Sequence, residues 1–93
     1  MNRIKSIVNQ NYKVTMQRGL ITSNTSMNDF VMKLEEEVQE FIDAAIYFKG
    51  DLKQELSDVI LVCLNIAKHY GINIESEMNN KIRKNFNRSV GGI

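Results

Sequence analysis

Acidic residues are concentrated in the middle of the chain. Residues 35–58 contain eight of the eleven Asp and Glu side chains and only two Lys side chains. Two pairs within this segment have the spacing i, i+3, namely Glu37 with Glu40 and Glu55 with Asp58. Carboxylate oxygens are the ligands that hard divalent cations prefer, and protein-bound Mg²⁺ keeps waters and substrate phosphates as its remaining ligands. The pattern therefore favours metal-assisted attack of water on a phosphoryl group.

Basic residues form a second group near the end of the chain. Lys81, Lys84, Asn85 and Arg88 have the spacing 0, +3, +4 and +7, which places them on one helical face. Three cations beside an amide are suited to binding a polyphosphate, and Asn85 could contact the sugar or the base. The same spacing equally fits a surface face that pairs with the acidic centre. Nucleic acid is not expected as a partner, because acids are abundant nearby and no aromatic residues are interleaved.

Four helical segments are expected to position these groups. The apolar periodicity predicts a helix over residues 3–17, and Ser26 with Asp29 predicts a capped start for the second. The second helix is expected to end with Gly50 at its C′ position, and Asp51 to cap the third. A fourth follows Asn73, and residues 89–93 are expected to fray. The fold class is all-α, a four-helix bundle in one domain over residues 1–93, with the second and third helices antiparallel.

On helical wheels, acidic side chains of the two central helices face each other. Glu37 falls inside the apolar stripe and Glu40 on its border, whereas Glu36 points away from it. Glu55 lies within the stripe of the third helix, and Asp58 lies at its edge. Two unit charges 4 Å apart repel by about 4 kcal/mol at an effective dielectric constant near 20. Such a cluster takes up protons, splays into solvent or holds a cation.

Each acidic motif also has a simpler explanation when taken alone. The run of Glu residues at 35–37 is typical of a solvated helix face. Glu55 and Asp58 would complement the positive N-terminus of the third helix. The combination on two neighbouring helices is what favours a metal site.

Composition limits the remaining classes of protein. The 93 residues are 43% hydrophobic and 25% charged, contain no proline and carry a net charge of +1. The apolar run 59–64 is far shorter than the roughly 20 residues that cross a bilayer, and no signal-peptide stretch follows Met1. The single Cys63, expected to be a core thiol, fits a reducing compartment, so a cytoplasmic location without membrane association is expected. The run 59–64 is apolar around the whole helix, which fits either a central helix within a compact bundle or a helix whose second face meets another subunit. Of these two, a homo-oligomer is predicted.

The order and spacing of four short motifs resemble the MazG-like, all-α nucleoside triphosphate pyrophosphohydrolases. Residues 36–40 match the family's Glu-Glu-x-x-Glu motif, and residues 55–58 match Glu-x-x-Asp. Residues 71–74 resemble its Gly-Ile-Asp-Leu turn, and residues 81–88 resemble its Lys-x-x-x-Asn-x-x-Arg stretch.

The resemblance implies Mg²⁺-dependent cleavage between the α- and β-phosphates of a nucleotide, which yields a monophosphate and pyrophosphate, with Mn²⁺ as a substitute ion. It also implies a homodimer or homotetramer whose active sites draw on more than one subunit. It assigns metal binding to Glu37, Glu40, Glu55 and Asp58, water positioning or an outer-shell role to Glu36, phosphate binding to Lys81, Lys84 and Arg88, and nucleoside contact to Asn85.

Some features leave alternatives open. Residues 3–17 carry no signature of the family, and Ser57 stands where the family often has Ala, so the base preference is not predicted. Phosphoribosyl-ATP pyrophosphohydrolases share the acidic motifs but fit the segment 81–88 less well. A catalytically silent helical adaptor or nucleotide-binding module is the alternative from another class.

Overall fold

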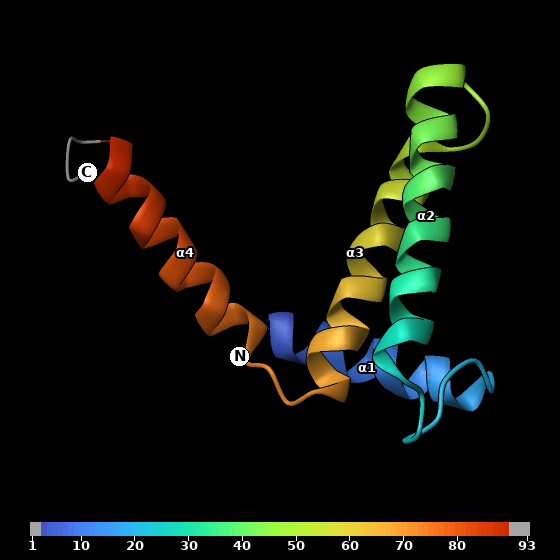
Figure 1. Ribbon diagram of the computed structural model, residues 1–93, viewed down its shortest axis with the longest axis horizontal. Helices are drawn as coiled ribbons and strands as arrows, with labels where there is room; N and C mark the ends of the chain where they lie inside the picture. The colour runs from blue at the N-terminus through green and yellow to red at the C-terminus, as the bar shows by residue number, and fades with distance from the viewer. Residues whose placement is uncertain (1–2, 90–93) are drawn as a thin grey trace.

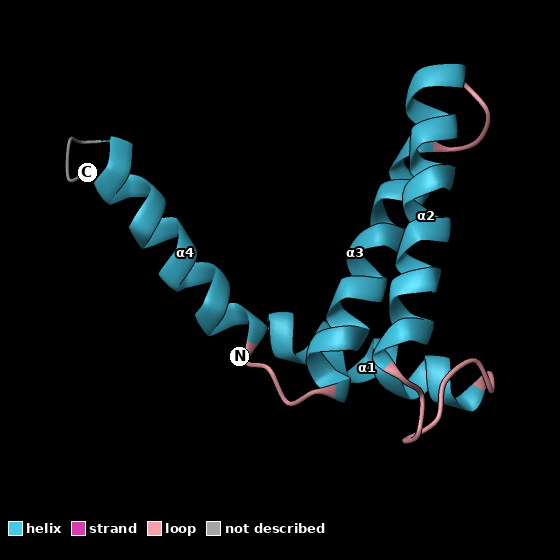
Figure 2. Ribbon diagram, in the orientation of Figure 1, coloured by secondary structure: helices cyan, strands magenta, loops and turns pink. Residues whose placement is uncertain are grey.

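The computed structural model describes residues 3–89, and four α-helices account for most of this range (Figure 1). They are α1 (Arg3–Gln17), α2 (Met27–Tyr47), α3 (Leu52–His69) and α4 (Ile74–Ser89). No strand occurs within the described residues (Figure 2). The all-α, four-helix prediction is therefore confirmed, whereas most of the predicted frayed tail, residues 90–93, lies outside the described residues.

Polar side chains begin three of the helices where the sequence predicts. At the start of α2, Ser26 accepts a hydrogen bond from the Asp29 backbone N–H at 3.2 Å, and Asp29 Oδ2 accepts one from the Ser26 backbone N–H at 3.4 Å. Asp51 accepts from the first backbone N–H groups of α3, and Asn73 accepts from the Ser76 N–H at 3.1 Å. These caps satisfy N–H groups that have no partner inside the helix.

The end of α2 differs from the prediction. The helix ends at Tyr47, and Phe48 follows it in the left-handed conformation with φ of 57°, while Gly50, two residues later, also has a positive φ of 122°. Phe48 is 89% exposed, so an additional helical turn would bury little of its ring. The backbone N–H groups of Phe48 and Lys49 both reach the Asp43 carbonyl, which satisfies it as the chain leaves the helix.

The packed part of the molecule consists of α1, α2 and α3. Helices α2 and α3 form an antiparallel hairpin, and α1 lies across α3 at the end away from the hairpin turn (Figure 1). Tyr12 of α1 bonds to His69 of α3, with 2.8 Å between the hydroxyl oxygen and Nδ1. Phe30 of α2 packs on the same imidazole, with ring centroids 4.8 Å apart. The buried apolar side chains are few: Val8, Ile21, Phe30, Ala44, Leu64 and Ala67.

The position of helix α4 within one chain departs from the predicted four-helix bundle. It projects away from the hairpin (Figure 1), and none of its residues is buried. Ile82 and Phe86 are 64% and 62% exposed. The apolar edge of α4 is therefore left uncovered by the other helices of the described chain.

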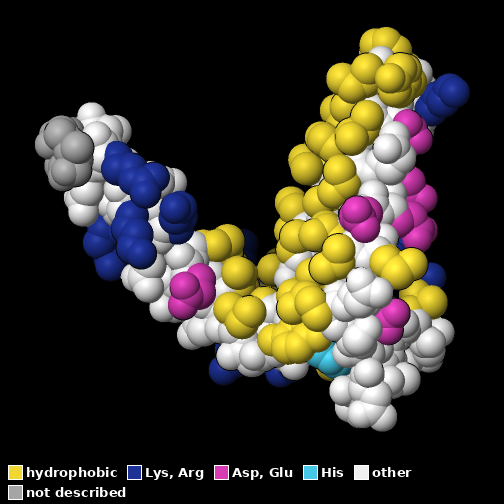
Figure 3. Space-filling view, viewed as in Figure 1, with side chains coloured by type: hydrophobic (Ala, Val, Ile, Leu, Met, Phe, Trp, Pro, Cys, Tyr) yellow, Lys and Arg dark blue, Asp and Glu magenta, His cyan; other side chains and the backbone are white. Residues whose placement is uncertain are grey.

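The outward position of α4 leaves apolar surface uncovered on the hairpin. Figure 3 shows hydrophobic side chains along the length of α2 and α3, on the side that faces α4. Ile60, within the apolar run 59–64, is 50% exposed, and Cys63 is also exposed. The expectation that Cys63 is a core thiol is therefore wrong, since this face of α3 has no neighbour within the described chain.

Among residues 3–89, no helix combines the length and apolar character needed to cross a bilayer.

Candidate metal centre

Three carboxylates from the two hairpin helices meet near one point. Glu37 of α2 and Glu55 and Asp58 of α3 each offer an oxygen, and these oxygens all lie within 4.8 Å of one another. Glu37 is only 7% exposed because it lies in the apolar stripe of α2. Asp51 sets the start of α3, so Glu55 and Asp58 fall in its first two turns, opposite Glu37. The hairpin therefore concentrates negative charge at its seam.

Two oxygens in this cluster lack a protein partner. Glu37 Oε2 and Glu55 Oε2 are buried, and neither has a hydrogen-bond partner among the described residues. A buried acceptor without a partner costs about 1–3 kcal/mol, and more when it is charged. A hard divalent cation with oxygen ligands would satisfy both atoms and offset the repulsion between the carboxylates. The donor set and the two orphaned oxygens thus fit a divalent metal ion.

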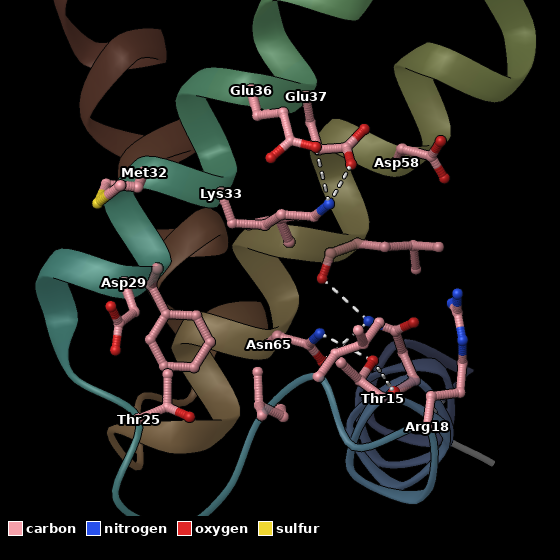
Figure 4. Close-up of a pocket in the computed structure, with 16 residues that line it drawn as sticks. Thr15, Arg18, Thr25, Asp29, Met32, Lys33, Glu36, Glu37, Asp58 and Asn65 are labelled. Carbon is pink, nitrogen blue, oxygen red and sulfur yellow. Dashed lines mark hydrogen bonds and ion pairs between the residues drawn. The ribbon is translucent and has the colours of Figure 1, made fainter.

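Lys33 partly neutralises the cluster. Its Nζ lies 3.0 Å from Glu37 Oε1 and 3.3 Å from Glu36 Oε1 (Figure 4). The hydrogen bond to Glu37 is the main reason that the pKa of Lys33 is raised. This ion pair fixes one oxygen of Glu37 and leaves the other, Oε2, buried and without a partner among the described residues. A single ammonium group cannot balance three carboxylates, so the site retains a net negative charge.

Glu40 joins the cluster from the solvent side. It is exposed and is not one of the three closely spaced carboxylates. A hydrogen bond with Glu37, followed by the negative charge of Glu37 and of Glu55, raises the pKa of Glu40 to about 7. Nearby negative charge disfavours the ionised form of Glu40, which is why these neighbours raise its pKa. Glu40 therefore lies within reach of the site on its open side.

The remaining predicted site residues lie elsewhere on the surface. The side chain of Glu36 is 59% exposed and contacts Lys33 rather than the other carboxylates. The predicted phosphate and nucleoside residues are all exposed on α4, which the single chain holds away from the hairpin. These residues are Lys81, Lys84, Asn85 and Arg88. The chain alone therefore does not bring them to the acidic cluster.

A cavity of about 710 Å³ opens beside the carboxylates. Side chains of α1, the α1–α2 loop, α2 and α3 line it, and Glu37 and Asp58 form part of its wall. Lys33, Asn65 and Asn11 also line it, and none of the three is among the site residues predicted from the sequence. The i, i+4 spacing between Lys33 and Glu37 could have identified Lys33 as a partner of the acidic cluster. No local signal in the sequence marks Asn11 or Asn65.

The fold and the site define a helical protein with an acidic candidate metal centre at a hairpin seam. Residues 25–90 match the family model described as the MazG nucleotide pyrophosphohydrolase domain, and the chain belongs to this family. The matched region contains both acidic motifs and the whole of the basic helix α4, but not α1. No curated protein and no solved structure gave a significant match to the chain.

Proposed function

We propose that this protein hydrolyses a nucleoside triphosphate between the α- and β-phosphates, with Mg²⁺ as the metal and Mn²⁺ as a substitute. One water is consumed, the bridging P–O bond breaks, and the products are a nucleoside monophosphate and pyrophosphate. The observation that carries this proposal is the group of three carboxylates within 4.8 Å, two of which have a buried oxygen without a partner. Membership of the MazG family supports the reaction class.

Glu37, Glu55 and Asp58 would hold the metal, and Glu40 would complete the set from the solvent side. When bound, the ion supplies Lewis-acid activation and charge neutralisation at the phosphates. Lys33 orients Glu37 by holding its Oε1 at 3.0 Å. Glu36, on the cavity wall near Lys33, is the residue we assign to positioning the attacking water.

We assign phosphate binding to Lys81, Lys84 and Arg88, and nucleoside contact to Asn85, in a homodimer or homotetramer. Because α4 projects from its own hairpin, these residues would act on the acidic cluster of a second copy. Apolar side chains are exposed both on α4 and on the hairpin, among them Phe86 and Ile60. Packing of α4 against another chain would cover both surfaces and place cations beside the carboxylates.

Replacement of Phe86 by Asp is expected to weaken this association. Loss of one buried aromatic side chain costs about 2–3 kcal/mol, which corresponds to roughly 30–150-fold in the dissociation constant. Sedimentation or light scattering should give a mass at least twice the 10.7 kDa of one chain for the wild type, falling toward one chain for Phe86→Asp. Asn80→Asp, about 120° around α4 from Phe86, should leave the mass unchanged. A monomeric wild type would refute the assembly.

The reaction is tested by incubating the protein with a panel of nucleoside triphosphates and Mg²⁺ and measuring pyrophosphate and monophosphate together. Equal amounts of the two products from at least one nucleotide support the proposal. Release of inorganic phosphate alone, or no turnover with any nucleotide, contradicts it. Nucleotide binding without turnover would instead favour the silent nucleotide-binding module.

Thermal unfolding provides a separate test of the metal centre. An ion that binds only the folded state at 100 times its dissociation constant adds about 2.7 kcal/mol to the free energy of unfolding. For a domain of this size that raises Tm by roughly 10–20 °C. Mg²⁺ or Mn²⁺ should produce this rise in the wild type, whereas NaCl at equal ionic strength should not. An equal rise in Glu55→Gln would contradict the proposed ligand set.

A further inference from the structure

Two amide side chains, half-buried Asn11 and buried Asn65, connect α1 to α3 at the wall of the large cavity. Asn65 of α3 is 6% exposed. Asn11 Nδ2 donates to the Leu61 carbonyl oxygen at 3.0 Å and to Asn65 Oδ1 at 2.9 Å. Asn65 Nδ2 donates to Thr15 Oγ1 at 3.1 Å, and the Thr15 hydroxyl donates to the Asn11 carbonyl oxygen at 2.7 Å. Asn11, Thr15, Leu61 and Asn65 all line the cavity.

These hydrogen bonds fix the orientation of both amides. The Leu61 carbonyl oxygen can only accept, so the Asn11 amide must present its nitrogen to α3. Asn65 must then present Oδ1 to Asn11 and Nδ2 to Thr15. The Thr15 hydroxyl hydrogen is already committed to the Asn11 backbone, so its oxygen acts as the acceptor for Asn65. Neither amide can be reversed without losing a bond.

The network leaves one donor and one acceptor unused. Both hydrogens of Asn11 Nδ2 are bonded, but its Oδ1 has no hydrogen-bond partner among residues 3–89. Only one of the two hydrogens on Asn65 Nδ2 is bonded within the same range. Here an N–H and a C=O remain for a ligand in the cavity.

The two ends of the cavity differ in chemistry. Figure 4 shows Glu37 and Asp58 on one side, Asn65 and Thr15 on the other, and Lys33 between them. Buried Phe30 and Ile21 contribute apolar wall. A site with apolar walls, amides at one end and metal-binding carboxylates at the other suits a ligand that joins a flat polar ring to a polyphosphate.

We propose that Asn65 and Asn11 bind the edge of the substrate's nucleobase and set the base preference of the enzyme. The inference rests on the proposed function and adds the specificity-determining residues. The recognised edge carries a hydrogen-bond donor for Asn11 Oδ1 and an acceptor for Asn65 Nδ2. Because bases differ in the order and position of such groups, the rigid amide pair favours some bases over others. The role of α1 is then to hold Asn11 and Thr15 against α3.

The first test uses the wild-type protein, so it does not depend on the folding of a variant. The side-chain amide signals of Asn65 and Asn11 are followed by NMR during titration with nucleoside monophosphates, which are not consumed. We expect saturable shifts whose size depends on the base, whereas ribose 5-phosphate, which lacks a base, leaves these signals in place. Equal shifts with ribose 5-phosphate, or no shift with any monophosphate, would overturn the proposal.

The second test compares base preference in two matched variants. Asn65→Asp keeps the shape and the acceptor for Asn11 but removes the donor. The ratio of kcat/KM between the best and the poorest nucleoside triphosphate should change by about tenfold or more. Asn9→Asp makes the same change on α1 outside this cavity, and its ratio should equal that of the wild type.

The ratio separates this proposal from a structural role and from the proposed function. Loss of stability would lower turnover of all nucleotides together and leave their ratio unchanged, which would refute base recognition by Asn65. Wild-type turnover with unchanged base ratios in Asn65→Asp would refute this inference alone. Absence of wild-type turnover would refute the proposed function, while the monophosphate titration would still decide whether the amides bind a base.

Discussion

Replacement of Glu37 by Gln is expected to lower kcat/KM for pyrophosphate release by at least about 100-fold, equivalent to roughly 2.7 kcal/mol of transition-state stabilisation. Glu37 is the most buried carboxylate of the cluster, and its Oε2 is one of the two oxygens without a partner. An amide keeps the size of the side chain but removes the charge that attracts a divalent cation. The effect should therefore appear in activity and in the Mg²⁺-induced rise of Tm together.

Glu35→Gln is the matched control for this variant. Glu35 lies on the same helix two residues away, is exposed, and belongs to neither the cluster nor the cavity. Its kcat/KM and its response to Mg²⁺ should stay at the wild-type level. If Glu37→Gln retained wild-type turnover, or if both variants lost activity equally, the metal centre proposed at the hairpin seam would be wrong.

Mixing two inactive variants is expected to restore activity. One chain carries Glu37→Gln, and the other carries Ala in place of Lys81, Lys84 and Arg88. If α4 acts on the cluster of a partner, each mixed dimer contains one site with both lesions and one intact site. Random association at equal concentrations makes half of the dimers mixed, so the mixture should reach about a quarter of wild-type activity.

The outcome depends on which chain supplies the cations. If α4 folded back onto its own cluster, every site in the mixture would carry one lesion, and activity would stay at the level of the separate variants. Native mass spectrometry of the mixture provides the control, since it shows whether mixed dimers form. An inactive mixture that contains mixed dimers would contradict binding of phosphates across the interface.

The helices and their starts could be predicted from sequence because they depend on nearby residues. Ser26 and Asp29 cap α2 through bonds across three positions, and Asp51 caps α3 in the same way. Helical periodicity likewise predicted that Glu37 lies in an apolar stripe, which its burial confirms. Both follow from the fixed geometry of an α-helix, which needs no information about distant parts of the chain.

Other features depended on tertiary packing. The sequence did not show that Phe48 takes the left-handed conformation directly after α2, nor that α4 leaves the hairpin uncovered. The bonds between Asn11 and Asn65 join residues 54 positions apart. Such contacts follow from how whole helices are placed against one another. The sequence by itself therefore determined the four helices and the acidic faces of two of them. Only the tertiary structure decided which side chains share a cavity and which helix stays apart. Both of these features depend on the burial that is gained between distant segments of the chain.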